Sequence, residues 1–322
     1  MNAIQGLHHI TAVAGDPQAN LVFYQRVLGQ RLVKTTVNFD DPGTYHLYYG
    51  DETGTPGTIL TFFPWRHMPR GRVGAGETSA VAYAIPRDAL SYWLERLTAF
   101  GLSVKEVEPR FGDRVIRFYD PDGMKLELVA SGDPSTIQHW NEGPVDAAHA
   151  LRGFHSVSLL LHEVEPTAEL LTGQLGYRFV GTEGDRHRYA GASSDRGLYV
   201  DLVHAPNEAP GRFGAGSIHH IAFRTVDDEE QIAYQTRLYD AGVGVTEVKD
   251  RQYFHSIYFR SPGGVLFEIA TDAPGFAYDE PVPALGSALK LPPWMEPRRA
   301  EIETRLPAID RAARHPKEAI DA

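Results

Sequence analysis

The chain repeats one short pattern four times, and this repeat limits its fold more than any other feature. Each copy opens with a stretch that alternates or runs apolar, as a β-strand does, at residues 7–13, 79–85, 154–160 and 218–224. An amphipathic stretch follows and ends at a glycine, which is Gly29, Gly101, Gly176 or Gly242. The remainder of each copy is rich in β-forming residues. Each copy therefore predicts a β-α-β-β-β unit of about 50–60 residues.

One such unit has too little sheet to close a hydrophobic core alone, so we expect the units to pair. The predicted fold class is α+β, with four βαβββ modules paired into two half-open β-barrels and the helices outside. We expect an N-terminal domain at 1–130 with modules one and two, a linker at 131–152, and a C-terminal domain at 153–272 with modules three and four. A proline-rich tail at 273–322, with a short helix near 298–313, should wrap the surface.

Composition excludes several kinds of site and partner. None of the 322 residues is cysteine, which rules out disulfides, thiolate nucleophiles and iron–sulfur clusters, so any metal must be held by His, Asp or Glu. The net charge of −11 argues against nucleic acid as a partner. The apolar runs fall short of the roughly 18–20 residues that span a bilayer. No signal peptide is recognisable, so we expect a cytoplasmic protein, with a homodimer or higher homo-oligomer as the default assembly.

Adjacent histidines occur in two of the four opening strands, as His8–His9 and His219–His220. When the four units are aligned, one position on the opening strand holds His9, Val81, Ser156 and His220. One position on the closing strand holds Thr61, Glu127, Asp201 and Glu268. If the first and fourth units pair, one cavity receives two imidazoles and a carboxylate, with a threonine at the fourth position. The second and third units would then form a similar cavity without an imidazole.

Two histidines and one carboxylate are the ligand set typical of non-haem Fe(II), which keeps open positions for substrate and O₂. The same ligands also suit Mn(II), Zn(II) or Ni(II), so ligand type alone does not choose the metal. A single histidine on an apolar strand is more often a hydrogen-bonded core residue. The repeated pair, with a glutamate at the matching closing position, favours a metal site formed by His9, His220 and Glu268.

Longer segments resemble a known family. They are GLHHITAVAGD at 6–16, YHLYYGDETGTPGTILTFFPW at 45–65, SIHHIAF at 217–223 and SPGGVLFEIATDAPGF at 261–276. Together with the four-unit repeat, they resemble the vicinal oxygen chelate superfamily, and within it the dioxygenases that cleave hydroquinone-type aromatic rings. The resemblance implies Fe(2+) bound by His9, His220 and Glu268, with a small aromatic substrate and O₂; Mn(2+) remains an alternative.

The resemblance also implies roles near the metal for five further residues, which are His8, Thr11, His219, Arg251 and Tyr258. Thr11 shares a strand face with His9, which agrees with such a role. By simple alternation along a strand, His8 and His219 should face away from the metal. His255 receives no role.

Three other functions remain open. A catechol extradiol dioxygenase would use the same chemistry on an ortho-diol. A glyoxalase-like isomerase or lyase would use Ni(II) or Zn(II), but such enzymes usually present four protein ligands, and Thr61 argues against a fourth. A metal-free protein that sequesters an aromatic compound would not bind stoichiometric iron.

Overall fold

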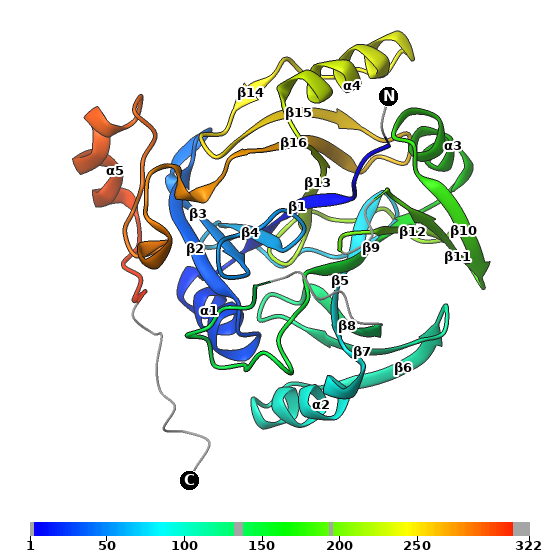
Figure 1. Cartoon of the computed structure of the whole chain (residues 1–322), viewed down its shortest axis with the longest axis horizontal. Helices are drawn as coiled ribbons and strands as arrows, with labels where there is room; N and C mark the ends of the chain where they lie inside the picture. The colour runs from blue at the N-terminus through cyan, green and yellow to red at the C-terminus, as the bar shows by residue number, and fades with distance from the viewer. Residues whose placement is uncertain (1–2, 132–137, 193–195, 312–322) are drawn as a thin grey trace.

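The computed structural model describes residues 3–131, 138–192 and 196–311, and within them each predicted unit is present (Figure 1). The first unit comprises β1 (Leu7–Ala14), α1 (Pro17–Val22), the π-helical turn η1 (Phe23–Val27), β2 (Arg31–Asn38), β3 (Asp41–Gly50) and β4 (Ile59–Pro64). The fourth comprises β13 (Ile218–Thr225), α4 (Asp228–Asp240), β14 (Lys249–Asp250), β15 (Phe254–Arg260) and β16 (Leu266–Pro274).

The two inner units follow the same order. The second comprises β5 (Glu77–Pro86), the 3₁₀ turn η2 (Arg87–Ala89), α2 (Leu90–Ala99), β6 (Lys105–Arg110), β7 (Asp113–Tyr119) and β8 (Lys125–Ser131). The third comprises β9 (Phe154–Leu161), α3 (Glu165–Glu169), the π-helical turn η3 (Leu170–Gln174), β10 (Arg178–Glu183), β11 (Arg186–Ala190) and β12 (Tyr199–His204).

The strand order confirms the predicted pairing of units. One sheet runs β14-β15-β16-β13-β1-β4-β3-β2 and joins the fourth unit to the first, through an antiparallel pairing of β1 with β13. The other runs β10-β11-β12-β9-β5-β8-β7-β6 and joins the third unit to the second. Both sheets curl, and the helices lie on their outer sides (Figure 1). The predicted fold class of two half-open barrels with helices outside is therefore confirmed.

Local sequence explains where the helices begin and end. Asp16 caps α1, because its carboxylate accepts a 2.8 Å hydrogen bond from the backbone N–H of Ala19, and Pro17 follows at the first helical position. The four glycines that end the helical stretches have φ between 70° and 76°, a left-handed conformation that glycine adopts without strain. The repeated glycine is thus a requirement of the turn into the next strand.

The opening strands are buried on both faces. All eight residues of β1 are buried, with Leu7, Ile10 and Ala12 in the main apolar core. Residues that alternate with these, including His9 and Thr11, are directed toward the concave side of the sheet. A polar residue at one of these positions is therefore enclosed by protein, where it must find a polar partner or a ligand.

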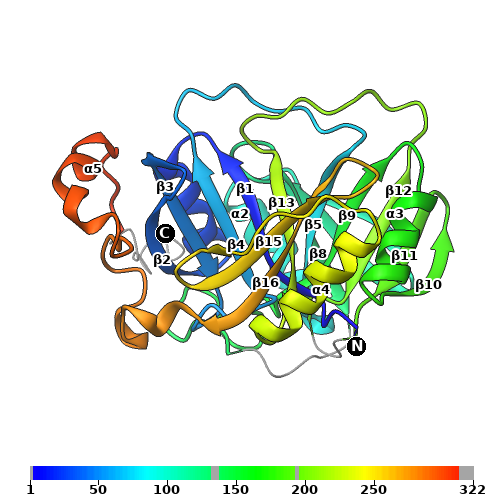
Figure 2. The same ribbon diagram turned by 90° about the horizontal axis from the view of Figure 1, so that it is seen from above.

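The two barrels are tied together at several points. The segments that link units one and two and units three and four arch side by side over one end of the molecule (Figure 2), with isolated β-bridges between Arg70 and Ala215 and between Arg72 and Arg212. Elsewhere the hydroxyl of Tyr24 donates a 3.0 Å hydrogen bond to Asp120 of the second unit.

The tail packs along β2. Lys34 is fully buried and contacts Asp279 and Glu280 at 2.5 and 2.6 Å, and Leu289 forms a β-bridge with Thr35. The short tail helix α5 spans Arg299–Arg305, so it ends earlier than the prediction of a helix near 298–313.

The helix stops because Leu306 precedes a proline and takes an extended conformation. Residues 312–322 lie outside the described part of the chain, as do 132–137 of the predicted linker. The domain division at 131–152 stays a prediction. In the described residues, no helix combines the length and apolar character that crossing a membrane would require.

Candidate metal centre

Three predicted ligands from both ends of the chain meet in the first barrel. His9 on β1, His220 on β13 and Glu268 on β16 are all buried, and one potential ligand atom from each lies within 4.8 Å of the others. Nε2 of His9 lies 3.3 Å, and Nε2 of His220 2.8 Å, from Oε2 of Glu268. The pairing of the outer units brings these side chains together across more than two hundred residues of sequence.

The donor atoms converge in the way that a bound cation would require. Oε2 of Glu268 is buried and has no hydrogen-bond partner among the described residues, although two ring nitrogens lie close to it. Its other oxygen, Oε1, accepts a short hydrogen bond from the hydroxyl of Ser256. A buried carboxylate oxygen without a hydrogen bond is costly. A divalent cation among the two Nε2 atoms and Oε2 would satisfy it, so the residues present fit a metal ion.

The protonation states also suit a metal ligand set. Burial raises the pKa of Glu268, but the imidazoles of His9 and His220 outweigh it and hold the pKa well below its usual value. Burial lowers the pKa of His220, and Glu268 opposes this only in part. Near neutral pH the group therefore holds an ionised carboxylate and a neutral imidazole at these two positions, which are the ligating forms.

His9 and His220, called the inner histidines, each contact the histidine that precedes them in the sequence. Nδ1 of His8 lies 2.9 Å from Nδ1 of His9, and Nδ1 of His219 lies 2.7 Å from Nδ1 of His220. One ring of each pair must donate and the other accept. When the inner histidine donates from Nδ1, its Nε2 keeps a lone pair for a metal.

The expectation that His8 and His219 face away does not hold, because β-bulges interrupt strand alternation at both pairs. The register between β1 and β13 shifts twice. One shift leaves out His8, between Leu7 and His9, and the other leaves out His219, between Ile218 and His220. A bulge inserts one residue and re-aims its side chain. Burial, and then its neighbour His220, lower the pKa of His219 to about 3, so this ring is neutral.

The other residues predicted near the metal also line this barrel. Tyr258 pairs with Glu268 across β15 and β16, and its ring centroid lies 5.7 Å from that of His220. Nε of Arg251 donates a 3.1 Å hydrogen bond to the Tyr258 hydroxyl. Thr11 pairs with His220 across β1 and β13. The structure thus brings all five of these residues around the three potential ligands.

Sequence reasoning missed polar side chains on β3 beside this group. Nε2 of His46 lies 2.8 Å from Oγ1 of Thr61, and Nδ1 of His46 lies 2.8 Å from the hydroxyl of Tyr48. Thr61 in turn lies 2.9 Å from Oγ1 of Thr11. Tyr48 pairs with Thr61 as Tyr258 pairs with Glu268. Aligning the third strand of each unit, in addition to the first and last, would have found these residues.

The second barrel holds arginines where the first holds imidazoles. Arg110 and Arg117 donate to Glu127, which keeps the pKa of this carboxyl at about 2 although burial alone would raise it. Arg188 donates two hydrogen bonds, of 2.8 and 2.9 Å, to Asp201. Both carboxylates are therefore neutralised by guanidinium groups.

One aligned position requires a correction. In the strand register, Ala82 pairs with Glu127 as Ala222 pairs with Glu268, so the residue equivalent to His220 is Ala80. The sequence alignment placed Val81 there. That assignment lies one residue too far along β5. Val81 belongs to the apolar core on the other face.

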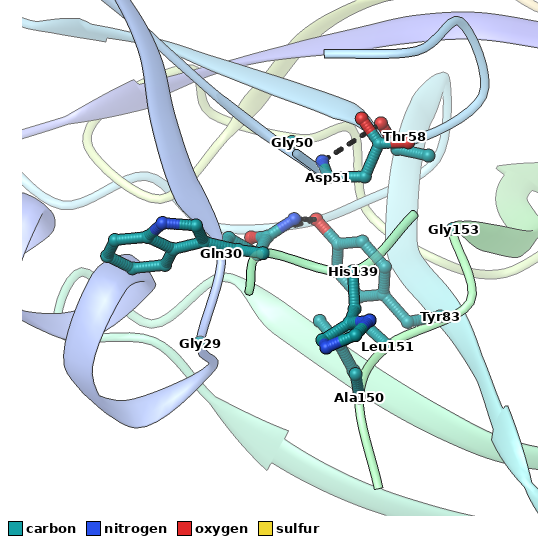
Figure 3. A pocket seen from close by; sticks show the side chains of 11 residues that line it. Gly29, Gln30, Gly50, Asp51, Thr58, Tyr83, His139, Ala150, Leu151 and Gly153 are labelled. Atoms are coloured by element: carbon teal, nitrogen blue, oxygen red, sulfur yellow. Dashed lines mark hydrogen bonds between the residues drawn. The ribbon is translucent and has the colours of Figure 1, made fainter. Parts of the chain in front are cut away.

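Two other features lie away from the metal group. His255 contacts Asp228 on α4 at 2.6 Å, and its side chain is partly exposed. Figure 3 shows a small cavity where Gln30 is hydrogen-bonded to Tyr83 and Asp51 lies close by. Its volume of about 20 Å³ suits a single water molecule. None of its lining residues belongs to the metal group.

Comparisons with known proteins agree with this architecture. The family model described as "Glyoxalase/Bleomycin resistance protein/Dioxygenase superfamily" matches residues 6–128 and 140–269. A Bacillus subtilis protein named "Putative ring-cleaving dioxygenase MhqO" is 48% identical over 303 residues, which cover 94% of this chain and 95% of the relative. The "Chlorohydroquinone/hydroquinone 1,2-dioxygenase" of Sphingobium indicum is 38% identical over 307 residues, covering 93% and 95%.

Solved structures show the same fold. The crystal structure of a "putative dioxygenase" from Bacillus subtilis is 46% identical, with a TM-score of 0.92, and the match covers 96% of this chain and 99% of that one. Maize glyoxalase I has a TM-score of 0.61 at 14% identity, covering 83% and 92%, which shows the fold alone. With a family model matched over both halves of the chain, and with relatives aligned along nearly its whole length, this protein belongs to the glyoxalase/bleomycin resistance protein/dioxygenase superfamily.

Proposed function

We propose that this protein is an Fe(II)-dependent dioxygenase that cleaves the ring of hydroquinone-type aromatics with O₂. The observation that carries this proposal is the buried group of His9, His220 and Glu268, with an uncharged threonine, Thr61, at the fourth equivalent position. Three protein ligands leave coordination positions open, as oxygen-activating iron requires. The ring-cleaving names of the relatives support the same reaction class.

Aromatic side chains beside the metal group support an aromatic substrate. The ring of Phe254 lies 4.8 Å from His9, and that of Phe63 lies 5.9 Å from His219, measured between centroids. Phe63 also contacts Trp65 at 5.4 Å. Phe63 and Trp65 are only partly buried, so this aromatic pair, which contacts His219 through Phe63, reaches the surface. Flat apolar surfaces of this kind pack well against a substrate ring.

The chain's own residues would orient the substrate and stabilise charge. Iron(II), when bound, would supply open positions for a phenolic oxygen and for O₂, and would let electrons pass from the substrate ring to O₂. Tyr258 accepts a hydrogen bond from Arg251, and burial raises its pKa, so it remains a phenol that can donate a hydrogen bond. Arg251 places a positive charge behind this hydroxyl, which favours an anionic oxygen in front of it.

His8 and His219 would act as positioning residues, because each contacts Nδ1 of a ligand histidine.

Oxygen uptake with metal-loaded protein tests the proposal. The protein is reconstituted with Fe(II) without air, and O₂ consumption is followed with methylhydroquinone or chlorohydroquinone. Stoichiometric iron and rapid uptake are expected for the wild type. His9→Ala, His220→Ala and Glu268→Gln should lose iron and activity.

Matched controls come from the second barrel. Glu127→Gln and Asp201→Asn change buried carboxylates at the equivalent closing positions and should keep iron and turnover. Iron loss from these variants comparable to that from Glu268→Gln would contradict the assignment of the site.

Further measurements distinguish the proposed function from the alternative functions. Faster turnover of catechol than of hydroquinone would identify a catechol extradiol dioxygenase. Iron or other metal binding without O₂ consumption would favour an isomerase or lyase, and absence of metal binding would favour a sequestering protein. Activity reconstituted with Mn(II) instead of Fe(II) would decide the metal.

A further inference from the structure

A chain of hydrogen-bonded side chains connects β3 and β4, which carry none of the three potential ligands, to β1. It runs from the hydroxyl of Tyr48 to Nδ1 of His46, from Nε2 of His46 to Thr61, and from Thr61 to Thr11, with distances of 2.8, 2.8 and 2.9 Å. Thr11 lies across from His220 in the sheet. The chain therefore ends beside the metal group, although none of its members belongs to that group.

Comparison of the repeated units shows which contact takes the place of the His46–Thr61 hydrogen bond in the fourth unit. His46 lies two residues before Tyr48 on β3, and Ser256 lies two residues before Tyr258 on β15. Ser256 donates to Glu268, so in the fourth unit this position supports a metal-binding carboxylate. In the first unit the equivalent contact joins His46 to Thr61. The same scaffold position thus supports a charged ligand on one side and a hydroxyl on the other.

Resting on the function proposed above, we propose that His46 is a positioning residue that directs the hydroxyl proton of Thr11 toward an oxygen atom of the bound reactants. Nε2–H of His46 donates to Thr61, Thr61 donates to Thr11, and Thr11 is left with its own O–H free to donate into the site. Thr61, at the position equivalent to Glu268, then takes part in a hydrogen-bond chain to the reactants instead of binding the metal.

Donor and acceptor capacity allows two directions for this chain of hydrogen bonds, and the relative acidity of its hydroxyl groups selects between them. A neutral imidazole has one N–H and one acceptor nitrogen, so His46 can donate on only one side. A phenol is a stronger acid than an aliphatic alcohol, so Tyr48 is the better donor and Nδ1 of His46 accepts from it. The N–H of His46 is then at Nε2, facing Thr61.

The surroundings keep His46 neutral. Burial lowers its pKa well below the usual value, and the imidazoles of His9 and His220 and the guanidinium of Arg251 add to this effect. Its ring packs against those of Tyr48 and Phe63, with centroid distances of 4.0 and 4.3 Å. A neutral imidazole with these packing contacts and two hydrogen-bond partners suits a donor of constant direction.

The first test reads the tautomer of His46 in metal-free protein and needs no turnover. Nitrogen-15 NMR of histidine-labelled protein should show His46 with its proton on Nε2, with the resonance assigned by its loss in His46→Phe. Tyr48→Phe removes the donor to Nδ1 and should shift the ring toward the other tautomer. A wild-type ring protonated on Nδ1 would overturn the proposal.

The second test uses kinetics of the iron-loaded enzyme. Thr11→Val should retain iron and lower kcat by about 10- to 100-fold with little change in KM, because a donor that acts in the transition state is lost. His46→Phe should cause a similar loss, and His46→Gln, whose amide can donate to Thr61, should recover part of the activity.

Coupling between the two positions separates a positioning role from a merely structural one. The double variant Thr11→Val/His46→Phe should be no slower than Thr11→Val alone, because both changes remove the same hydrogen bond to the reactants. Multiplied losses in the double variant would overturn the proposal. If the wild type consumes no O₂ with hydroquinones, the proposed function fails, while the NMR result still decides the orientation of His46.

Discussion

Asp120 is a buried carboxyl that should make stability depend on pH. It lies in the turn between β7 and β8, where its Oδ1 accepts hydrogen bonds of 3.0 and 2.8 Å from the backbone N–H groups of Asp122 and Met124. Its Oδ2 accepts from the hydroxyl of Tyr24 in the other barrel. Burial outweighs these hydrogen bonds and raises the pKa of Asp120 to about 7.

The direction of the pH dependence follows from the proton balance. An aspartate in the unfolded chain titrates near about pH 4. Between about pH 4 and about pH 7 the folded chain therefore holds a proton that the unfolded chain has released, and the free energy of unfolding falls as pH rises. A difference of about three pKa units, at about 1.4 kcal/mol each, gives an upper bound of ~4 kcal/mol for the whole window.

Asp120→Asn removes this dependence while preserving the local hydrogen bonds. The amide oxygen can still accept from the two backbone N–H groups, and the amide nitrogen can donate to Tyr24. Urea unfolding at about pH 5 and about pH 8 measures the effect. The wild type should lose about 2–3 kcal/mol relative to the variant over this interval. Asp88→Asn, an exposed change in η2 of the same barrel, serves as the control and should follow the wild type. Parallel stability curves for wild type and Asp120→Asn would refute the reasoning.

Three further changes test how buried charges hold the fold and the site. Lys34→Met should lower the free energy of unfolding by about 3–5 kcal/mol, because Glu280 is left buried without its cation; urea unfolding measures this, and an unchanged midpoint would contradict it. Arg188→Met should destabilise by about 1.5–3 kcal/mol, because Asp201 loses two hydrogen bonds but keeps Arg186, and it should leave iron content unchanged; loss of iron would show that the second barrel contributes to the site. Ser256→Ala removes the hydrogen bond to Glu268, the proposed carboxylate ligand, and should weaken iron binding by about 10- to 100-fold in a chelator competition titration, whereas wild-type affinity would argue that this hydrogen bond does not orient the carboxylate.

The repeat allowed the fold and the three potential ligands to be predicted, because strand period, helix-ending glycines and unit pairing are properties of local sequence. Gly29 and Gly176 mark equivalent turns without any knowledge of tertiary structure. The equivalence of Glu268 with Thr61 followed in the same way. One alignment of the four units, together with the assumption that the first unit pairs with the fourth, placed two imidazoles and one carboxylate in the same cavity.

The remaining features depend on tertiary contacts that no local pattern records. The β-bulges that turn His8 and His219 toward their neighbours arise from the pairing of two distant strands. The arginines that neutralise Glu127 come from other strands of the second barrel, and their residue type is equally common on solvated surfaces. The burial of Lys34 depends on a tail that docks from the far end of the sequence.

The doubled histidines have a physical explanation in this strand geometry. A ligand imidazole must present Nε2 to the metal, and a partner on Nδ1 fixes which tautomer does so. A partner from another strand would need its own precise placement, whereas a bulge brings the preceding residue of the same strand to within 2.9 Å at His9 and 2.7 Å at His220. The second barrel shows the consequence of losing this arrangement: His155 occupies the position equivalent to His219, but its Nδ1 lies 3.1 Å from the hydroxyl of Ser156 instead of a second imidazole. The bulges are thus retained in both barrels, but the residues that follow them are histidines in the first barrel and Ala80 and Ser156 in the second, so only the first barrel brings two imidazoles to one carboxylate.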